Sequence, residues 1–507
     1  MPIFAANHNF NPLGIIVNQS VKGTIYTYIG VILGFVIQGV LFPRLYSTDE
    51  IGLTKIIVAY AALVTQFATL GFNGVTIRLF PFFKDSKSHH HGYLSLALLT
   101  GLIGFLISLV LFLIFKTWFI EYTSEKSALL VGYLNYLIVL IFFQIFFTLF
   151  DGYYTALLNS IHGTFLREVF QRILIIIGIG FFYFDLINFH QFIVVYIASM
   201  AAPTLFILFT LIKEGQFSFK TDFAFLQRPL LNSMGLMALF SILNGFTTNI
   251  ILTVDTIMIT GMAGLSATGI YGSCMIFGIM VSLPSRSILK ITNIVSARAW
   301  KERNMEAIRN IYEKSCLTLF IIGLLMFLGL WVNISNVFEI LGPKFVSGKW
   351  VIFFIGFGSL VDMTTGANSS ILGSSPHYRI QSYFLIALVI LLIVSNLLLI
   401  PIYGITGAAI GGAVSLSILN LLRFLYLWYK FNLQPFNLKF ILVAALGVSA
   451  YMITSLLPVL PNFIADIFVR SSILSVLFCL PVYLLKISPD INEKADEALK
   501  MLRLKAK

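Results

Sequence analysis

The chain has 507 residues, of which 58% are hydrophobic and only 11% are charged, and its mean hydropathy is +0.94. A soluble protein carries about 25% charged residues, and one this apolar could not cover its hydrophobic side chains with polar surface. The composition therefore excludes a soluble enzyme, a nucleic-acid-binding protein and a disordered scaffold. The formal net charge of +12 is better interpreted through membrane topology than as affinity for nucleic acid.

Apolar runs long enough to cross a bilayer recur along the whole chain, and each is bounded by charged or Pro/Gly-rich segments. A crossing helix needs about 20 residues, and the periodicity predicts about fourteen such helices. They are expected at 18–42, 52–78, 93–115, 128–150, 166–184, 190–212, 230–261, 266–285, 316–335, 350–371, 381–401, 404–429, 438–456 and 466–485. We therefore expect an all-α polytopic membrane protein.

Lysine and arginine are distributed unequally between the two sides of the predicted membrane. With the N-terminus and the even-numbered connections on one side, 26 of these residues fall there and 7 fall on the other side. Because cytoplasmic connections carry the excess of basic residues, both termini are predicted to be cytoplasmic. Ser488 and Pro489 then suit the start of an amphipathic helix in the C-terminal tail.

A weak internal repeat relates the two halves of the chain. Aligning Gly52 with Gly269 gives an offset of 217 residues, which places Gln38 opposite Asp255. Six spans in each half would preserve orientation, so the repeat predicts two pseudo-symmetric six-helix lobes. The expected organisation is an N-terminal lobe at 1–220, a C-terminal lobe at 221–430, two additional transmembrane helices at 431–487 and a cytoplasmic amphipathic tail at 488–507.

Two acidic residues lie where the membrane is expected to be. Asp255 falls in the outer half of the seventh span, and Asp362 falls near the middle of the tenth. An ionisable residue inside a span is costly, so it is a functional hypothesis by default. The functional interpretation is proton or cation coupling, or contact with substrate sugars. The alternative is a structural ion pair or a hydrogen-bonded contact between helices.

Several basic residues lie near the ends of the predicted spans. Singly, each is expected to be an interfacial anchor, but as a set they could line a cationic cavity suited to an anionic head group, since arginine matches phosphate oxygens in a bidentate way. These candidates are Arg44, Arg78, Arg286, Lys290 and Lys22. Arg167 and Arg172 are weaker candidates for the same role.

The sequence offers no pattern typical of an enzyme, a metal site or a cofactor site. The Gly-rich segment 342–350 has the wrong spacing for a phosphate-binding loop and is predicted to be extracytoplasmic. The consecutive His89, His90 and His91 are expected to be solvated on a loop rather than to bind a metal. We therefore expect no catalytic residues, no metal and no cofactor.

Five stretches resemble the polysaccharide-exporting flippases, the Wzx-type branch of the superfamily that also holds the MATE multidrug exporters. These stretches are 42–53, 70–81, 255–259, 360–368 and 400–410, and the last is the most specific. The resemblance implies two lobes that form a V-shaped, alternately open cavity. It also implies Arg44 and Arg78 as cationic positions and Asp255 as the acid of the seventh span, whereas the neutral Gln38 departs from a charged first-span residue.

The resemblance further implies the transport of a polyprenyl-pyrophosphate-linked oligosaccharide from the cytoplasmic to the outer leaflet of a bacterial inner membrane. The implied partners are this lipid-linked oligosaccharide, membrane lipids and the polysaccharide polymerase machinery, with no nucleic acid, and the protein is expected to be a monomer. The alternatives are a cation-coupled multidrug exporter and a peptidoglycan-precursor flippase of the same superfamily. The energy source could be an ion gradient, the membrane potential or consumption of the product outside.

Overall fold

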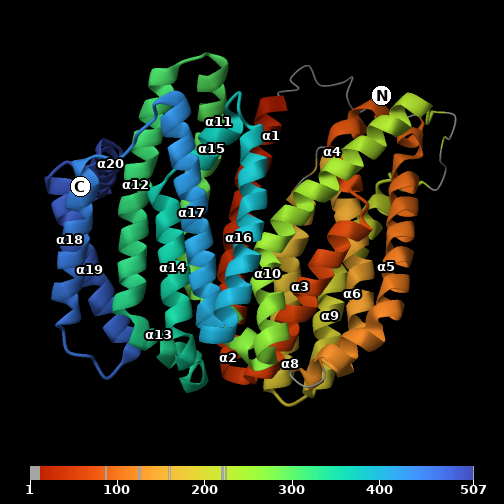
Figure 1. Cartoon of the computed structure of the whole chain (residues 1–507), viewed down its shortest axis with the longest axis horizontal. Coiled ribbons are helices and arrows are strands. Elements are labelled where there is room, and N and C mark those ends of the chain that lie inside the picture. Colours follow the sequence, from red (N-terminus) through yellow and green to blue (C-terminus); the bar gives the residue numbers. More distant parts are fainter. Residues whose placement is uncertain are drawn as a thin grey trace. The chain divides into compact units, whose positions relative to one another are not determined.

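The computed structural model describes residues 12–85, 88–123, 127–157, 159, 161–218, 222 and 225–505, and every regular element among them is a helix (Figure 1). The beginning of the expected N-terminal lobe, 1–11, and the end of the expected tail, 506–507, lie outside the described residues. The chain divides into a first unit, Met1–Gly269, and a second unit, Ile270–Lys507. The all-α architecture predicted from the composition is confirmed.

The first unit is built around one long central helix, α6. This helix packs against α3, α4, α5 and α9, so side chains that point inward from four neighbours meet along it. The elements of this unit are α1 (Pro12–Phe35), η1 (Val36–Leu41), α2 (Phe42–Leu45), α3 (Thr48–Ala68), α4 (Phe72–Phe83), η2 (His89–Gly92), α5 (Tyr93–Thr123), α6 (Ala128–Ala156), α7 (Ile161–Phe165), η3 (Leu166–Phe170), α8 (Gln171–Tyr183), α9 (Phe189–Lys213) and most of α10 (Arg228–Met280).

Twelve of the described helices are long and apolar enough to cross a membrane. The difference from fourteen arises where helices are joined or broken. Helix α10 continues through Gly264, whose φ of 89° and ψ of 178° are not helical, so the expected seventh and eighth spans form one kinked helix. The expected fifth span is divided between the π-helical η3 and α8, and the short α7 precedes it. The prediction of a polytopic helical protein with about fourteen spans is therefore confirmed.

The segment after the first span breaks one helix and caps the next. The backbone N–H of Glu50 donates to Ser47 Oγ at 3.3 Å, and the N–H of Ser47 donates to a carboxylate oxygen of Glu50 at 2.8 Å. This capping box satisfies two N–H groups that a helix start otherwise leaves unpaired. Part of the stretch that resembles the flippases thus fixes where α3 begins.

Two glycines allow α3 and α10 to cross at close range. A Cβ atom at Gly52 would overlap the backbone carbonyl of Leu265, and a Cβ atom at Gly269 would overlap that of Thr48. Under the 217-residue offset of the repeat, Thr48 corresponds to Leu265 and Gly52 to Gly269. The contacts are therefore reciprocal, as expected for equivalent segments related by a two-fold axis. The hydroxyls of Thr48 and Ser266 add a hydrogen bond of 2.7 Å.

The second unit contains two apolar clusters that share helix α12. One joins α12 to α14, α18 and α19 around Leu319, Val443 and Phe478, and the other joins α11, α12, α15 and α17 around Ile308 and Leu427. The elements are α11 (Ser285–Lys301), α12 (Met305–Val332), α13 (Ile334–Leu341), η4 (Pro343–Gly348), α14 (Lys349–Thr364), α15 (Asn368–Ser374), α16 (Arg379–Tyr403), α17 (Ile405–Phe431), α18 (Leu438–Ser455), α19 (Phe463–Leu484) and α20 (Pro489–Lys505).

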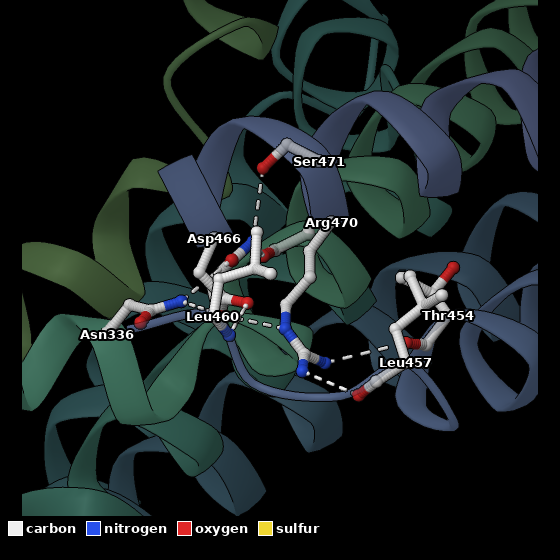
Figure 2. A network of polar contacts seen from close by, with 9 residues as sticks. Asn336, Thr454, Leu457, Leu460, Asp466, Arg470 and Ser471 are labelled. Carbon is white, nitrogen blue, oxygen red and sulfur yellow. Dashed lines mark hydrogen bonds and ion pairs between the residues drawn. The ribbon is translucent and has the colours of Figure 1, made fainter. Parts of the chain in front are cut away.

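A buried ion pair joins the last two long helices to the rest of the second unit (Figure 2). Arg470 Nε donates to Asp466 Oδ2 at 2.8 Å, and the two residues are only 6% and 2% exposed. Asn336 of α13 donates to the same carboxylate oxygen at 2.7 Å. The guanidinium also reaches the backbone carbonyls of Leu457, at 2.8 Å, and Thr454, at 3.5 Å. This network holds the α18–α19 connection against α13.

The C-terminal helix α20 lies within the tail expected at 488–507 and docks on the helical bundle. Asp490 forms an ion pair with Lys314 of α12 at 3.1 Å, and Ile491 packs against the apolar cluster around Val443. An amphipathic tail can lie on the membrane surface or dock on the helical bundle, and the first turn of α20 docks on the bundle.

The expectation of a solvated histidine loop is wrong for His90 and His91, whereas His89 is exposed as expected. His90 is only 4% exposed, and its Nδ1 accepts a hydrogen bond of 3.1 Å from the backbone N–H of Asp85. His91 stacks on Phe225 with 3.9 Å between ring centroids and contacts Asp222 at 3.1 Å. The three residues form the tight turn η2 ahead of α5, so local packing rather than solvation places them.

Candidate functional site

The residues nominated from the sequence are spread over both units. Those in the first unit are Lys22 in α1, Arg44 in α2, Arg78 in α4 and Asp255 in α10. Those in the second unit are Arg286 and Lys290 in α11 and Asp362 in α14. All five basic side chains are exposed, and the two acids are half-buried. The structure brings none of the seven into the polar pocket of the first unit.

Asp362 belongs to a hydrogen-bonded network that joins α14, α15, α16 and α17. Its Oδ1 accepts a bond of 3.0 Å from Asn420, whose own Oδ1 accepts one of 3.0 Å from Asn368. The buried Arg423 donates to Gln381 at 3.2 Å and to Asn420 at 3.5 Å. Buried polar groups need hydrogen-bond partners. This network therefore supplies the contacts that a structural role of Asp362 requires.

A basic side chain does lie beside the neutral first-span position. Lys55 of α3 donates to the side-chain oxygen of Gln38 in the π-helical segment η1. Lys55 is half-buried and lies within the membrane-spanning helix Thr48–Ala68. The second span thus places a charged residue beside the neutral Gln38 of the first.

A polar pocket with a cavity volume of about 450 Å³ lies within the first unit. Its polar lining is made almost entirely of neutral side chains, and no acidic residue is among the described residues that line it. The polar side chains come from α3 and its C-terminal turn, α4, α6, η3 and α10, and are Thr65, Gln66, Thr69, Asn73, Gln144, Thr148, Arg167, Ser241 and Asn249.

Hydrogen bonds hold two of the pocket amides in place. Asn249 Nδ2 donates to Gln66 Oε1 at 3.0 Å and to the carbonyl of Gly245 at 3.1 Å. Gly245 lies directly against the amide of Gln66, where a Cβ atom would collide with it. The glycine therefore makes room for the contact between α3 and α10. Because the Gln66 nitrogen is not used in this bond, it can still donate to a ligand.

Thr65 offers an unused polar group at the same wall. The residue is only 7% exposed, and its hydroxyl has no hydrogen-bond partner among the described residues. A buried polar group without a partner costs free energy. Thr65 therefore adds a hydroxyl without a hydrogen-bond partner among the described residues to this wall of the pocket.

Arg167 is the charged member of the described pocket lining. It lies on the π-helical segment η3, and its guanidinium carbon is 5.1 Å from the ring centroid of Phe147. The same segment is anchored on the first span, because Arg172 bonds both Glu168, at 2.7 Å, and the carbonyl of Gly30. Single π-helical turns occur frequently at functional sites, and this one brings a cation to a pocket of amides and hydroxyls.

Sequence reasoning misses the pocket amides because each stands alone in an apolar run. Gln66, Asn73, Gln144 and Asn249 carry no charge, so neither the topology count nor the search for ionisable residues selects them. A search for uncharged amides within predicted spans could have found them. Arg167 counts mainly in the cytoplasmic basic set, and only secondarily as a candidate cation for the cavity.

No protein-family model and no curated protein matches the sequence, whereas several solved structures match the fold. A lipid II flippase, MurJ, in an inward closed conformation aligns with a TM-score of 0.72 at 13% identity, over 92% of this chain and 99% of that chain. An inward-facing multidrug resistance MATE transporter of the MOP superfamily aligns with a TM-score of 0.59 at 16% identity, over 83% and 98%.

A third match is a MOP superfamily transporter from Pyrococcus furiosus, with a TM-score of 0.51 at 15% identity, over 83% of this chain and 95% of that chain. In that transporter, the reverse polarity of the binding pocket suggests a different function. The chain therefore has the fold shared by these flippases and exporters, and the MATE-like architecture expected from the sequence is confirmed.

Proposed function

We propose that this protein is a flippase that moves a polyprenyl-pyrophosphate-linked oligosaccharide from the cytoplasmic to the outer leaflet of a bacterial inner membrane. The observation that carries the proposal is the pocket of the first unit, in which neutral amides and hydroxyls accompany one guanidinium. Amides and hydroxyls suit the hydroxyls of sugars, and a guanidinium suits a phosphate. The fold shared with a lipid II flippase supports the same class of substrate.

A pocket of amides, hydroxyls and one guanidinium meets the physical requirements for moving such a substrate across a membrane. A pyrophosphate and several sugars cannot cross about 30 Å of hydrocarbon without a polar path, whereas the prenyl chain can stay in lipid. A volume of about 450 Å³ is at the lower end of ligand pockets, so it would hold part of a head group and not a complete repeat unit. The rest would occupy a larger cavity that opens alternately to the two sides.

The residues nominated from the sequence have roles in this proposal. Arg44, Arg78, Arg286, Lys290 and Lys22 would line or gate the larger cationic cavity, and Asp255 and Asp362 would be the coupling or lumen acids. Both termini would be cytoplasmic, and the protein would work as a monomer among membrane lipids, delivering its product to the polymerase machinery. No cofactor is proposed.

A peptidoglycan-precursor flippase is the second candidate. It is favoured by the TM-score of 0.72 to a lipid II flippase, which extends over 92% of the chain. A cation-coupled multidrug exporter is favoured less, because a cationic drug would meet Arg167 rather than a carboxylate among the described residues of the pocket. The three candidates differ in the substrate that accumulates when the protein is lost.

The first test is to delete the gene and to determine which lipid-linked oligosaccharides accumulate in each leaflet. We expect a complete, unpolymerised repeat unit on the cytoplasmic side, restored to normal by the wild-type gene. Rescue by Arg78→Ala and Asp255→Asn would then test the cavity residues. Accumulation of peptidoglycan precursor would support the second candidate, and normal surface glycan with new sensitivity to cationic drugs would support the exporter.

The pocket is tested by replacing its central amide. Asn249→Leu removes the bond to Gln66 and leaves polar groups of pocket and substrate unpaired, which costs about 1–3 kcal/mol, so export should fall about tenfold or more. The readout is surface glycan per cell at equal protein in the membrane. Asn310→Leu, at an exposed position near the start of α12, is the matched control. Equal export by the two variants would exclude the pocket from the transport path.

A further inference from the structure

Asp151 is an acidic residue within a membrane-spanning helix. It is neither one of the two predicted coupling acids nor a residue of the pocket lining. It lies in α6, inside the span Ala128–Ala156, one turn beyond the pocket residue Thr148. The side chain is half-buried, and it has no hydrogen bond and no ion pair within 4.0 Å among the described residues. An ionisable side chain kept inside a span without direct partners indicates a function rather than a structural contact.

The neighbouring span is shaped around this carboxylate. A Cβ atom at Gly163 would collide with Asp151 Oδ1, so the absence of a side chain there lets the carboxylate lie against α7. Arg167 follows Gly163 by one helical turn, and its guanidinium lies over Phe147, one turn before Asp151 on α6. Both side chains therefore lie at the junction of α6 with α7 and η3.

We infer that Asp151 is an internal anion that competes with a phosphate group of the substrate for the charge of Arg167, and that it takes up a proton when the phosphate binds. The inference rests on the proposed function, because it assumes an anionic head group in the pocket. It adds a specificity-determining carboxylate that the nomination of Asp255 and Asp362 did not include.

The exchange of a proton for a phosphate contact follows because two anions, the Asp151 carboxylate and the substrate phosphate, compete for one guanidinium. When a phosphate oxygen accepts the N–H bonds of Arg167, two negative charges lie close together beside the half-buried Asp151, and this favours the protonated carboxyl. One proton passes from water to a carboxylate oxygen of Asp151, and no covalent bond other than O–H forms. When the phosphate leaves, the proton returns to water and Arg167 again faces the carboxylate.

Other titratable groups near this junction are engaged elsewhere. Tyr154 donates to Glu214 of α9 at 2.6 Å, Glu168 bonds Arg172 at 2.7 Å, and His162 contacts Asn159 at 3.2 Å. From the other packed helices, Lys55 of α3 bonds Gln38, Tyr93 of α5 bonds Thr76, and Arg78 of α4 is exposed. Arg167, which lies over Phe147, is the basic group of the described residues that this junction offers to Asp151.

The test uses the purified full-length chain and geranyl pyrophosphate, with inorganic pyrophosphate as a second probe. Removing the competing charge by Asp151→Asn should tighten binding of geranyl pyrophosphate about two- to fivefold at neutral pH, as expected for loss of one nearby charge. Proton uptake per bound probe should be larger in the wild type than in this variant, because the ionisation of the probe itself is common to both. The advantage of the variant should vanish at a pH low enough to protonate Asp151 in the wild type.

Two further variants separate charge from fold. Asp151→Glu keeps a carboxylate and should keep the extra proton uptake even if packing changes. Asp185→Asn removes an exposed acid in the turn after α8, where asparagine tolerates the φ of 56°, and should bind like the wild type. Tighter binding of both probes by Asp151→Asn would assign the competition to the phosphate, and tighter binding of geranyl pyrophosphate alone would assign it to a lipid-linked anion.

Equal affinity and equal proton uptake in the wild type and Asp151→Asn, with probe bound to both, would overturn this inference and leave the proposed function standing. Failure of the wild type to bind either probe would overturn both. The two failures are therefore distinguishable in one set of titrations.

Discussion

Arg470→Met is expected to lower the free energy of unfolding by about 3–5 kcal/mol, because it leaves the buried Asp466 carboxylate without its counter-ion. Methionine replaces the stem of the side chain but cannot donate the 2.8 Å bonds to Asp466 and to the carbonyl of Leu457. The end of α18 and the α18–α19 connection would then lose the bonds that their backbone carbonyls accept from α19. The measurement is the thermal unfolding temperature of purified protein in detergent, which should fall by several degrees.

The control and a compensating variant make this prediction specific. Lys494→Met removes the charge from an exposed ion pair of 2.7 Å in α20 and should leave the unfolding temperature unchanged. The double variant Asp466→Asn/Arg470→Met removes both buried charges and should recover much of the lost stability, since the cost comes from the unpaired charge. If Arg470→Met were as stable as the control, the network in Figure 2 would contribute no stability.

Gly52→Ala is expected to destabilise the crossing of α3 and α10 by about 1–3 kcal/mol, and Gly52→Val by more. The new Cβ atom would overlap the backbone carbonyl of Leu265, which no side-chain rotation can relieve. By the reciprocal geometry, Gly269→Ala should have an effect of similar size, because its Cβ atom meets the carbonyl of Thr48. The unfolding temperature and the yield of folded protein from the membrane report the effect.

Gly132→Ala provides the matched control for the crossing. Gly132 lies in α6 with nothing within 4 Å of an added Cβ atom, so alanine should be neutral or stabilise the helix by about 0.5–1 kcal/mol. If Gly52→Ala and Gly132→Ala behaved alike, the close crossing would not be required for stability. A large effect at Gly52 with none at Gly269 would contradict the two-fold relation between the segments.

The stretches that resemble the flippases have structural roles in several places. Ser47 and Glu50 cap α3, and Gly52 makes the crossing with α10. Gly404, with a φ of 57°, ends α16 and begins α17, and Gly407 brings these two helices together by lying against the carbonyl of Leu399. Such positions can be found in a sequence because a cap, a reversal or a close contact needs a particular residue type at a fixed spacing.

The candidate site could be predicted only in part, as Asp362 and Arg167 illustrate. The sequence shows that Asp362 lies in an apolar run, but the choice of Asn420 and Asn368 as neighbours depends on how α14, α15 and α17 pack. From the sequence, Arg167 can be interpreted equally well as a topological anchor or as a pocket residue, since a residue in either role can lie near a helix end. Its place over Phe147 requires the pairing of η3 with α6.

That the chain is a polytopic membrane protein, that it is all-α and roughly where its spans lie can be inferred from the sequence alone, because the cost of exposing polar backbone or charge to lipid acts on each segment independently. Which polar side chains meet is fixed only when the helices pack. Gln66 and Asn249 are 183 residues apart and form one hydrogen bond, while Asp151 and Arg167 are brought to one junction of successive spans. Such contacts depend on the rotation and register of whole helices, which packing fixes and hydropathy does not.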